Sequence, residues 1–321
     1  MNAKYSLIVI LAFMLFSCGK DEVIFIPDQD YTIDQTLLLR QIVEAPKKYK
    51  ISLTNDRFYF AAPNGLHIQI PSLALKNETG QPVTGDVVMT FDDMEYQKTQ
   101  LLYAPSTIYN GKMFESKKMV HLEFTQNGKS LVIGTPIEVV IPSTEDINSA
   151  SLILLDGIAN ESVTTTWIRR SSDANPLTFS AYQVGTGQDQ TTVEGYKILF
   201  ESNTKWIAIA KSEENVSNNT TITCLSIDKA LNHNNSVVYF ISNAGRSTFK
   251  VHNTGKNEWS ICTGELIPNA LSKGTFVVIS DLGNENYHFG MTNAVLETDE
   301  NVVITSESKT NKEIKEILAS L

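Results

Sequence analysis

The chain has 321 residues, of which 42% are hydrophobic, 9% aromatic and 19% charged, and its formal net charge is −10. This apolar content can fill the cores of two or three domains, so the composition favours a folded chain over a disordered one. The acidic balance disfavours the phosphates of nucleic acids and anionic lipid head groups, because both bind clustered cations. We therefore expect no nucleic-acid partner.

Residues 1–17 have the pattern of a secretory signal. Lys4 supplies a positive charge, and residues 5–16 (YSLIVILAFMLF) form an uncharged, largely apolar run. This run is too short to span a bilayer core of ~30 Å, but it suits the apolar region of a signal peptide. It ends in Leu15-Phe16-Ser17-Cys18, which resembles a lipobox and predicts cleavage before Cys18 and acylation of its thiol. The alternatives are an ordinary cleaved signal with a chance cysteine, or an uncleaved anchor helix.

Residues 18–45 are the expected lipidated tether. The tether begins with Gly19-Lys20-Asp21-Glu22, which resembles the export signal of Bacteroidetes surface lipoproteins. That resemblance implies an outer-membrane protein facing the medium, and the periplasmic face of the outer membrane is the alternative location. Residues 34–43 could form a short helix.

Most of the remaining chain has the pattern of a β protein. Apolar runs alternate with turn residues at intervals of about 8–12 residues, which favours sandwiches over βαβ units. We expect a first β-sandwich at 46–170, a linker region at 171–194 and a second β-rich domain at 195–321. The strands expected in the first domain are 50–53, 58–62, 66–70, 86–91, 119–125, 137–141, 151–155 and 164–168.

Three local patterns sharpen this expectation. Asn127-Gly128 between two β-rich runs predicts a type I′ hairpin, because both residues tolerate positive φ. Residues 119–124 (MVHLEF) are apolar on both faces, which favours a strand in the middle of a sheet. Thr310 and Glu313 form a predicted capping box before a short C-terminal helix. The expected fold class is therefore mostly β, a tandem β-sandwich with one terminal helix.

Several turn and core positions resemble a known family. The segments GLHIQIP at 65–71, Ala74-Leu75 and GQPVTGDV at 80–87 are similar to a pattern in Bacteroidetes lipoproteins of unknown function and in the ZU5 β-sandwich. The resemblance extends through scattered positions over most of residues 45–321. It implies a ZU5-like β-sandwich at 46–170. It also implies a binding role, since ZU5 relatives act as interaction modules.

Acidic and sulfur-containing residues give two candidate sites. Asp92, Asp93 and Glu95 are the densest acidic cluster in a β region, so they could bind Ca²⁺, serve as a pair of glycosidase acids, or be solvated loop residues. Cys224 and Cys262 could form one disulfide bond in an oxidising compartment, or remain two buried thiols.

Histidines and tryptophans were also considered as candidate site residues. The five histidines lack the spacing of a transition-metal site, and we expect His67 and His121 to be ordinary sheet residues and His233 to be solvated. The three tryptophans, Trp167, Trp206 and Trp259, could stack against a sugar or fill the domain cores.

The sequence contains neither of the catalytic or nucleotide-binding motifs that we looked for as signs of enzymatic activity. The sequence has no Gly-x-Ser-x-Gly elbow, and Glu123 stands where a Walker loop ending at Lys129 and Ser130 would need glycine. We therefore expect a non-catalytic binding module without a cofactor, attached to the membrane through Cys18 and displaying loops to a protein or glycan. The alternatives are a glycan-handling accessory or hydrolase, and a purely structural envelope protein.

Overall fold

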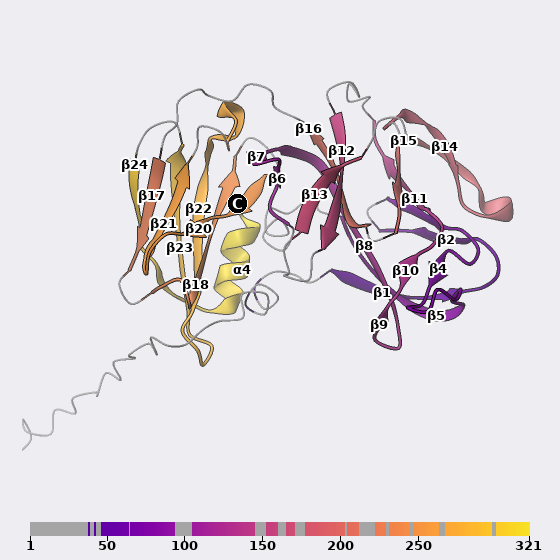
Figure 1. Ribbon diagram of the computed structural model, residues 1–321, viewed down its shortest axis with the longest axis horizontal. Helices are drawn as coiled ribbons and strands as arrows, with labels where there is room; N and C mark the ends of the chain where they lie inside the picture. The colour runs from indigo at the N-terminus through magenta and orange to yellow at the C-terminus, as the bar shows by residue number, and fades with distance from the viewer. Residues whose placement is uncertain are drawn as a thin grey trace, which may run out of the picture.

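The computed structural model describes residues 38, 42, 46–63, 65–93, 105–144, 152–159, 165–170, 177–202, 204–211, 222–228, 231–243, 247–262, 267–296 and 300–321. These residues form two β-sandwiches that lie side by side, with one helix on the outer face of the second (Figure 1). The expected mostly β fold with a terminal helix is confirmed.

The first sandwich packs a seven-stranded sheet on a five-stranded sheet. The larger sheet has the order β1-β5-β8-β16-β12-β13, with β9 added to β8, and the smaller has the order β14-β15-β11-β3-β2. A short pair, β4 and β10, closes one end. Their bounds are β1 Lys47–Leu53, β2 Phe58–Ala61, β3 His67–Ile70, β4 Leu75–Lys76, β5 Gly85–Asp93, β8 Glu115–Gln126, β9 Lys129–Ser130, β10 Val132–Ile133, β11 Ile137–Pro142, β12 Leu152–Ala159, β13 Thr165–Arg169, β14 Phe179–Val184, β15 Thr191–Phe200 and β16 Thr204–Lys211.

The second sandwich packs a four-stranded sheet on a five-stranded sheet. The first has the order β20-β21-β17-β24, in which β17 and β24 are parallel, and the second has the order β19-β18-β22-β23-β25. Their bounds are β17 Ile222–Ile227, β18 Ser236–Ser242, β19 Thr248–Lys250, β20 His252–Asn253, β21 Glu258–Cys262, β22 Lys273–Asp281, β23 Tyr287–Val295, β24 Glu300–Ile304, β25 Glu307–Lys309 and α4 Asn311–Ala319.

The boundary between the sandwiches lies later than the sequence suggested. The expected linker at 171–194 contains β14 and the start of β15, and β15 and β16 both belong to the first sandwich. The first sandwich therefore runs to Lys211, and the second begins at Ile222. The prediction was wrong because β14 and β15 form a hairpin at the edge of a sheet, where exposed strand positions are polar like those of a linker.

Strand β8 shows how the core of the first sandwich forms. It lies inside the larger sheet, and both of its faces are buried, as its doubly apolar sequence predicts. Val120, Leu122 and Phe124 point into the core between the two sheets, whereas Met119 belongs to a second cluster on the outer face. The following turn has positive φ at both Asn127 and Gly128, which confirms the predicted hairpin.

Arg170 joins the two sheets through a partly buried ion pair and a hydrogen bond to the backbone. Arg170 binds both carboxylate oxygens of Asp156 in the larger sheet, through Nε at 2.9 Å and through Nη2. Its Nη1 also donates to the carbonyl oxygen of Leu199 in β15, at 2.7 Å. This forked geometry satisfies the buried guanidinium and holds the sheets together.

The segment 105–114 connects the two sandwiches. It contains β6 Ile108–Tyr109 and β7 Lys112–Met113, and Met113 is buried in the core of the second sandwich. Thr107 exchanges hydrogen bonds with Thr248 of β19, its backbone N–H donating at 2.8 Å and its Oγ1 accepting at 2.9 Å. On the other side, Trp167 Nε1 donates to the carbonyl oxygen of Ser106 at 2.8 Å. This segment lies within the sequence of the first sandwich, but its side chains and hydrogen bonds contribute to the second sandwich.

The outer face of the five-stranded sheet in the second sandwich is covered from both ends of the chain. Leu38 and Ile42, both helical, are each 1% exposed and pack with Ile314 and Leu318 of α4. These two residues of the predicted tether therefore contact the second sandwich, although β1 of the first sandwich follows them in the chain. The rest of the predicted helix at 34–43 lies outside the described residues.

Replacing Thr310 by Ala is expected to lower the free energy of unfolding by about 1 kcal/mol. The predicted capping box is present, because Thr310 Oγ1 accepts from the backbone N–H of Glu313 at 3.3 Å and Glu313 Oε2 accepts from the backbone N–H of Thr310 at 2.7 Å. Urea unfolding measures the change, and Thr310→Ser should keep most of the stability. Equal stability of the alanine variant would contradict this account of the cap.

Candidate functional site

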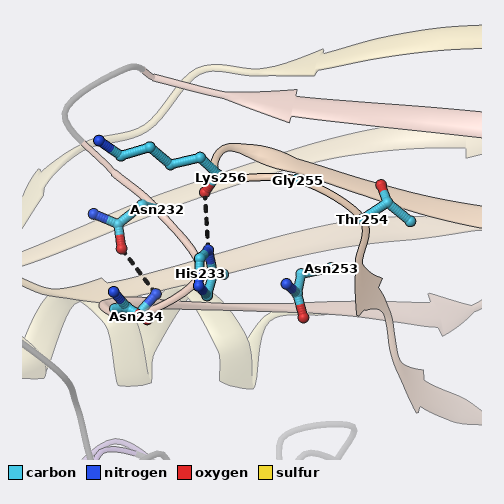
Figure 2. A pocket seen from close by; sticks show the side chains of 7 residues that line it. All are labelled: Asn232, His233, Asn234, Asn253, Thr254, Gly255 and Lys256. Carbon is cyan, nitrogen blue, oxygen red and sulfur yellow. Dashed lines mark hydrogen bonds between the residues drawn. The ribbon is translucent and has the colours of Figure 1, made fainter.

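An open polar groove lies at one end of the second sandwich. Its volume is about 560 Å³, and it is formed by the turn before β18 and the hairpin between β20 and β21 (Figure 2). Seven residues line it: Asn232, His233, Asn234, Asn253, Thr254, Gly255 and Lys256.

The turn before β18 is held by its own asparagines. Asn232 Oδ1 accepts from the backbone N–H of Asn234, and Asn235 Oδ1 accepts from the backbone N–H of Asn232, both at 2.8 Å. Asn235 is fully buried and also accepts from Ser236 Oγ at 2.9 Å. Such side-chain-to-backbone bonds are the reason that asparagine favours turns. One wall of the groove is therefore a fixed turn.

Two contacts join the turn to the hairpin. The backbone N–H of His233 donates to the carbonyl oxygen of Lys256 at 3.1 Å, and His233 Nδ1 lies 3.4 Å from the same oxygen. Within the hairpin, Thr254 N–H donates to the carbonyl oxygen of Glu258 at 2.9 Å. His233 is exposed, as expected, and its ring stands between the two walls (Figure 2).

The lining groups suit a partner rich in hydrogen-bonding groups. An asparagine side chain offers two donors and an acceptor, and Thr254 adds a hydroxyl. Small-molecule pockets are mostly apolar and enclosed, whereas this groove is open and polar. From the sequence we expected only that His233, in the segment LNHNNS, is solvated. The available signal was the second asparagine-rich segment, HNTGKNE, which forms the hairpin between β20 and β21 and contacts the turn where the His233 N–H donates to the Lys256 carbonyl.

The two acids of the predicted cluster that the structure describes, Asp92 and Asp93, do not converge on one site. Asp92 and Asp93 end β5 and are 9% and 7% exposed, so they are not solvated loop acids either, and Glu95 lies outside the described residues. Neighbouring strand residues point to opposite faces, so these two carboxylates diverge. Asp93 instead faces Lys118, with Oδ2 and Nζ 3.3 Å apart. Among the described residues, no group of three or more His, Cys, Asp or Glu side chains could hold a metal ion.

The disulfide bond considered for Cys224 and Cys262 is not formed, since Cys224 is a free and exposed cysteine. In the pairing of β17 and β21, Cys224 lies opposite Ser260 and Cys262 lies opposite Ile222. The cysteines are therefore diagonal neighbours, with Cα atoms roughly 7–8 Å apart, at the limit of what a disulfide can bridge. The alternative of a buried thiol is also wrong for Cys224, because the neighbouring Leu225 occupies the inward face.

The three tryptophans are core residues rather than a sugar platform. Trp167 and Trp206 are 5% and 6% exposed in the outer cluster of the first sandwich, and Trp259 is 3% exposed in the core of the second. Trp206 and Trp167 flank Gly157 in the same cross-strand row, which brings them into one cluster. Burial of the rings removes the faces that a sugar would need.

His67 and His121 lie in strands, as expected. His67 Nδ1 and Tyr59 Oη are hydrogen-bonded at 2.5 Å on the outer face of the smaller sheet. His121 is stacked on Trp206, with ring centroids 4.4 Å apart, and its Nε2 lies 3.9 Å from Glu123 Oε2. Burial lowers the pKa of His121 to about 4, with Glu123 opposing the shift and Lys205 adding to it. His121 is therefore neutral at pH 7.

The lipidation site predicted at Cys18 lies outside the described residues, as do the signal and the first part of the tether. In the part of the chain that the structure describes, no helix has the length and apolar character needed to cross a membrane.

Comparison with known proteins leaves the family open. No protein-family model matches the chain, and no curated protein matches it. The similarity of residues 45–321 to Bacteroidetes lipoproteins and to the ZU5 sandwich therefore stays a prediction from turn and core residues.

Proposed function

We propose that this chain is an outer-membrane lipoprotein, anchored through acylated Cys18 and facing the medium or the periplasm, that acts as a non-catalytic binding module. The groove of the second sandwich is its binding site, and the partner is a glycan whose hydroxyl groups pair with the groove amides. The observation that carries the binding role is the fixed asparagine turn, hydrogen-bonded to a facing hairpin across an open polar groove.

Three features support a glycan partner. The groove presents amide and hydroxyl groups, which donate and accept in the way that sugar hydroxyls do. Its wall is pre-formed, because the turn is held by internal hydrogen bonds, so little conformational entropy is lost on binding. The seven described residues that line the groove include neither Asp nor Glu, whereas glycoside cleavage uses a pair of carboxyl groups.

The anchor is tested by replacing Cys18 with Ser. Loss of the thiol prevents acylation, so the protein should move from the membrane pellet to the soluble fraction or accumulate with the signal uncleaved. Fractionation and intact mass report both outcomes. Cys224→Ser is the matched control, because it removes an exposed thiol and should leave the protein in the membrane. Unchanged fractionation and mass of the Cys18 variant would contradict the anchor.

The groove is tested with an array of neutral oligosaccharides, followed by titration calorimetry of the best binder. Replacing Asn253 by Ala should weaken binding about tenfold, because one amide-to-hydroxyl bond contributes roughly 1–1.5 kcal/mol. Asn243, exposed and just after β18 at the opposite end of the strand, provides the control: Asn243→Ala should bind as the parent does. Failure of every oligosaccharide, or equal affinity of the Asn253 variant, would contradict a glycan site in the groove.

A further inference from the structure

Strand β1 carries a dense cluster of exposed cations. Its sequence is KKYKISL, and Lys47, Lys48 and Lys50 are all exposed, whereas Tyr49 between them packs its ring against Phe60 at 4.7 Å. β1 is the edge strand of the seven-stranded sheet. Side chains alternate along a strand, so Lys48 and Lys50 lie on one face of the sheet and Lys47 on the other, and all three border the open edge. We refer to Lys47, Lys48 and Lys50 as the β1 lysines.

None of the β1 lysines forms an ion pair with a described residue, whereas seven other described lysines do. Elsewhere, lysines pair with carboxylates within 4.0 Å, including Lys197 with Glu138 and Lys205 with Glu123. Among the strands that the structure describes, the other sheet edges each carry at most one lysine; these edge strands are β2, β13, β14, β19, β20, β24 and β25. One lysine is enough to guard a sheet edge against pairing with another strand. β1 has three lysines within the four residues 47–50, which is more than protection of the edge requires.

We propose that the β1 lysines form a docking surface for anionic lipid head groups, which orients the anchored protein on its own membrane. This inference rests on the proposed lipid anchor. The net charge of −10 led us to expect no attraction to anionic head groups. Solvent ions, however, screen exposed charges that lie more than a Debye length of ~8 Å from the lysines. The local positive charge of the β1 lysines therefore decides how this part of the surface interacts with a membrane. Each lysine near an anionic surface strengthens association roughly fivefold.

The position of β1 in the chain supports this role. The tether contacts the second sandwich at Leu38 and Ile42, and five residues after Ile42 the chain reaches Lys47. Five residues span at most about 18 Å, so the β1 lysines lie close to the point where the tether meets the folded protein. A lipid chain and a basic cluster together hold a protein on a membrane more firmly than either signal alone. The tether supplies the local concentration that three lysines need to act.

The test uses the protein purified from membranes with its own N-terminus and reconstituted into two kinds of vesicle, phosphatidylcholine alone and phosphatidylcholine with 30% phosphatidylglycerol. Amine acetylation followed by mass spectrometry reports the accessibility of each lysine. In the anionic vesicles, acetylation of the β1 lysines is expected to slow about tenfold, and 0.5 M salt should restore it. Lys129 and Lys273, exposed elsewhere on the molecule, serve as internal controls and should react equally in both vesicles.

A charge variant separates docking from edge protection. Lys47→Gln/Lys48→Gln/Lys50→Gln is expected to transfer from anionic donor vesicles to neutral acceptors about 100-fold faster than the parent, whereas Lys129→Gln/Lys273→Gln/Lys315→Gln should transfer at the parental rate. Equal acetylation in the two vesicles, or a triple variant that only self-associates without faster transfer, would overturn the proposal. The intact mass from the same sample shows whether Cys18 is acylated, so failure of the anchor is distinguished from failure of the docking surface.

Discussion

Replacing Lys118 by Met is expected to lower the free energy of unfolding by about 3–5 kcal/mol. The Asp93 side chain is fully buried and that of Lys118 is 9% exposed, with 3.3 Å between Oδ2 and Nζ. Methionine fills the space of the lysine stem but removes the ammonium charge that faces the carboxylate. The buried Asp93 then loses the ammonium group that lies 3.3 Å from its Oδ2, which makes its ionised form more costly to bury. Urea unfolding at pH 7 measures the loss.

The double variant Lys118→Met/Asp93→Leu provides the control. It removes both charges together and should recover most of the lost stability, since an apolar pair of similar volume avoids the desolvation of two ions. Lys129→Met removes a pairing with Glu78 at 4.0 Å on the exposed surface and should change stability by less than about 1 kcal/mol. Parental stability of the single Lys118 variant would contradict the buried pair.

A second large effect is expected from pH. The pKa of His121 is lowered by burial to about 4 from its ordinary 6.5, so the unfolded chain binds a proton between these values that the folded chain does not. The folded state is therefore fully stable with respect to this group above about pH 6.5, and stability falls as the pH is lowered toward 4. The total loss is roughly 3 kcal/mol, because each pKa unit corresponds to about 1.4 kcal/mol.

Comparison of the protein with His121→Phe isolates this contribution. Phenylalanine keeps a ring against Trp206 but cannot take up a proton, so the variant should lose less stability between pH 6.5 and 4.5. His233→Gln, a change at an exposed histidine, should follow the parental curve. Parallel stability curves for the parent and His121→Phe would show that His121 does not couple folding to pH.

The fold class was predictable because its signals are local. Alternating apolar residues mark strands such as β5 and β11, Asn127-Gly128 specifies a hairpin, and the Thr310 capping box begins α4. The domain boundary was not predictable, because it depends on which sheet accepts the polar hairpin of β14 and β15. That choice rests in part on Gly195, where a Cβ atom would lie 2.0 Å from the carbonyl oxygen of Ile141.

The surroundings of the candidate site residues depend on the register between strands, which cannot be read from the sequence. The acids of β5 looked like loop residues, but the antiparallel register places Asp92 opposite His121 and Asp93 opposite Val120, inside the sheet. The cysteines failed to bond because their register is diagonal. The groove was missed because its two asparagine-rich segments are about 20 residues apart in sequence and meet only where β20 folds back beside the turn at 232–234.

Mass spectrometry of the N-terminal peptide, from protein extracted out of cell membranes, tests the central claim that the molecule is held at the envelope by lipid. The expected peptide begins at Cys18, and its mass exceeds that of the unmodified sequence by a diacylglyceryl group, with or without a further acyl chain on the amine. A peptide that contains Cys18 as a plain thiol, or that still carries the preceding residues in the mature protein, would contradict the account.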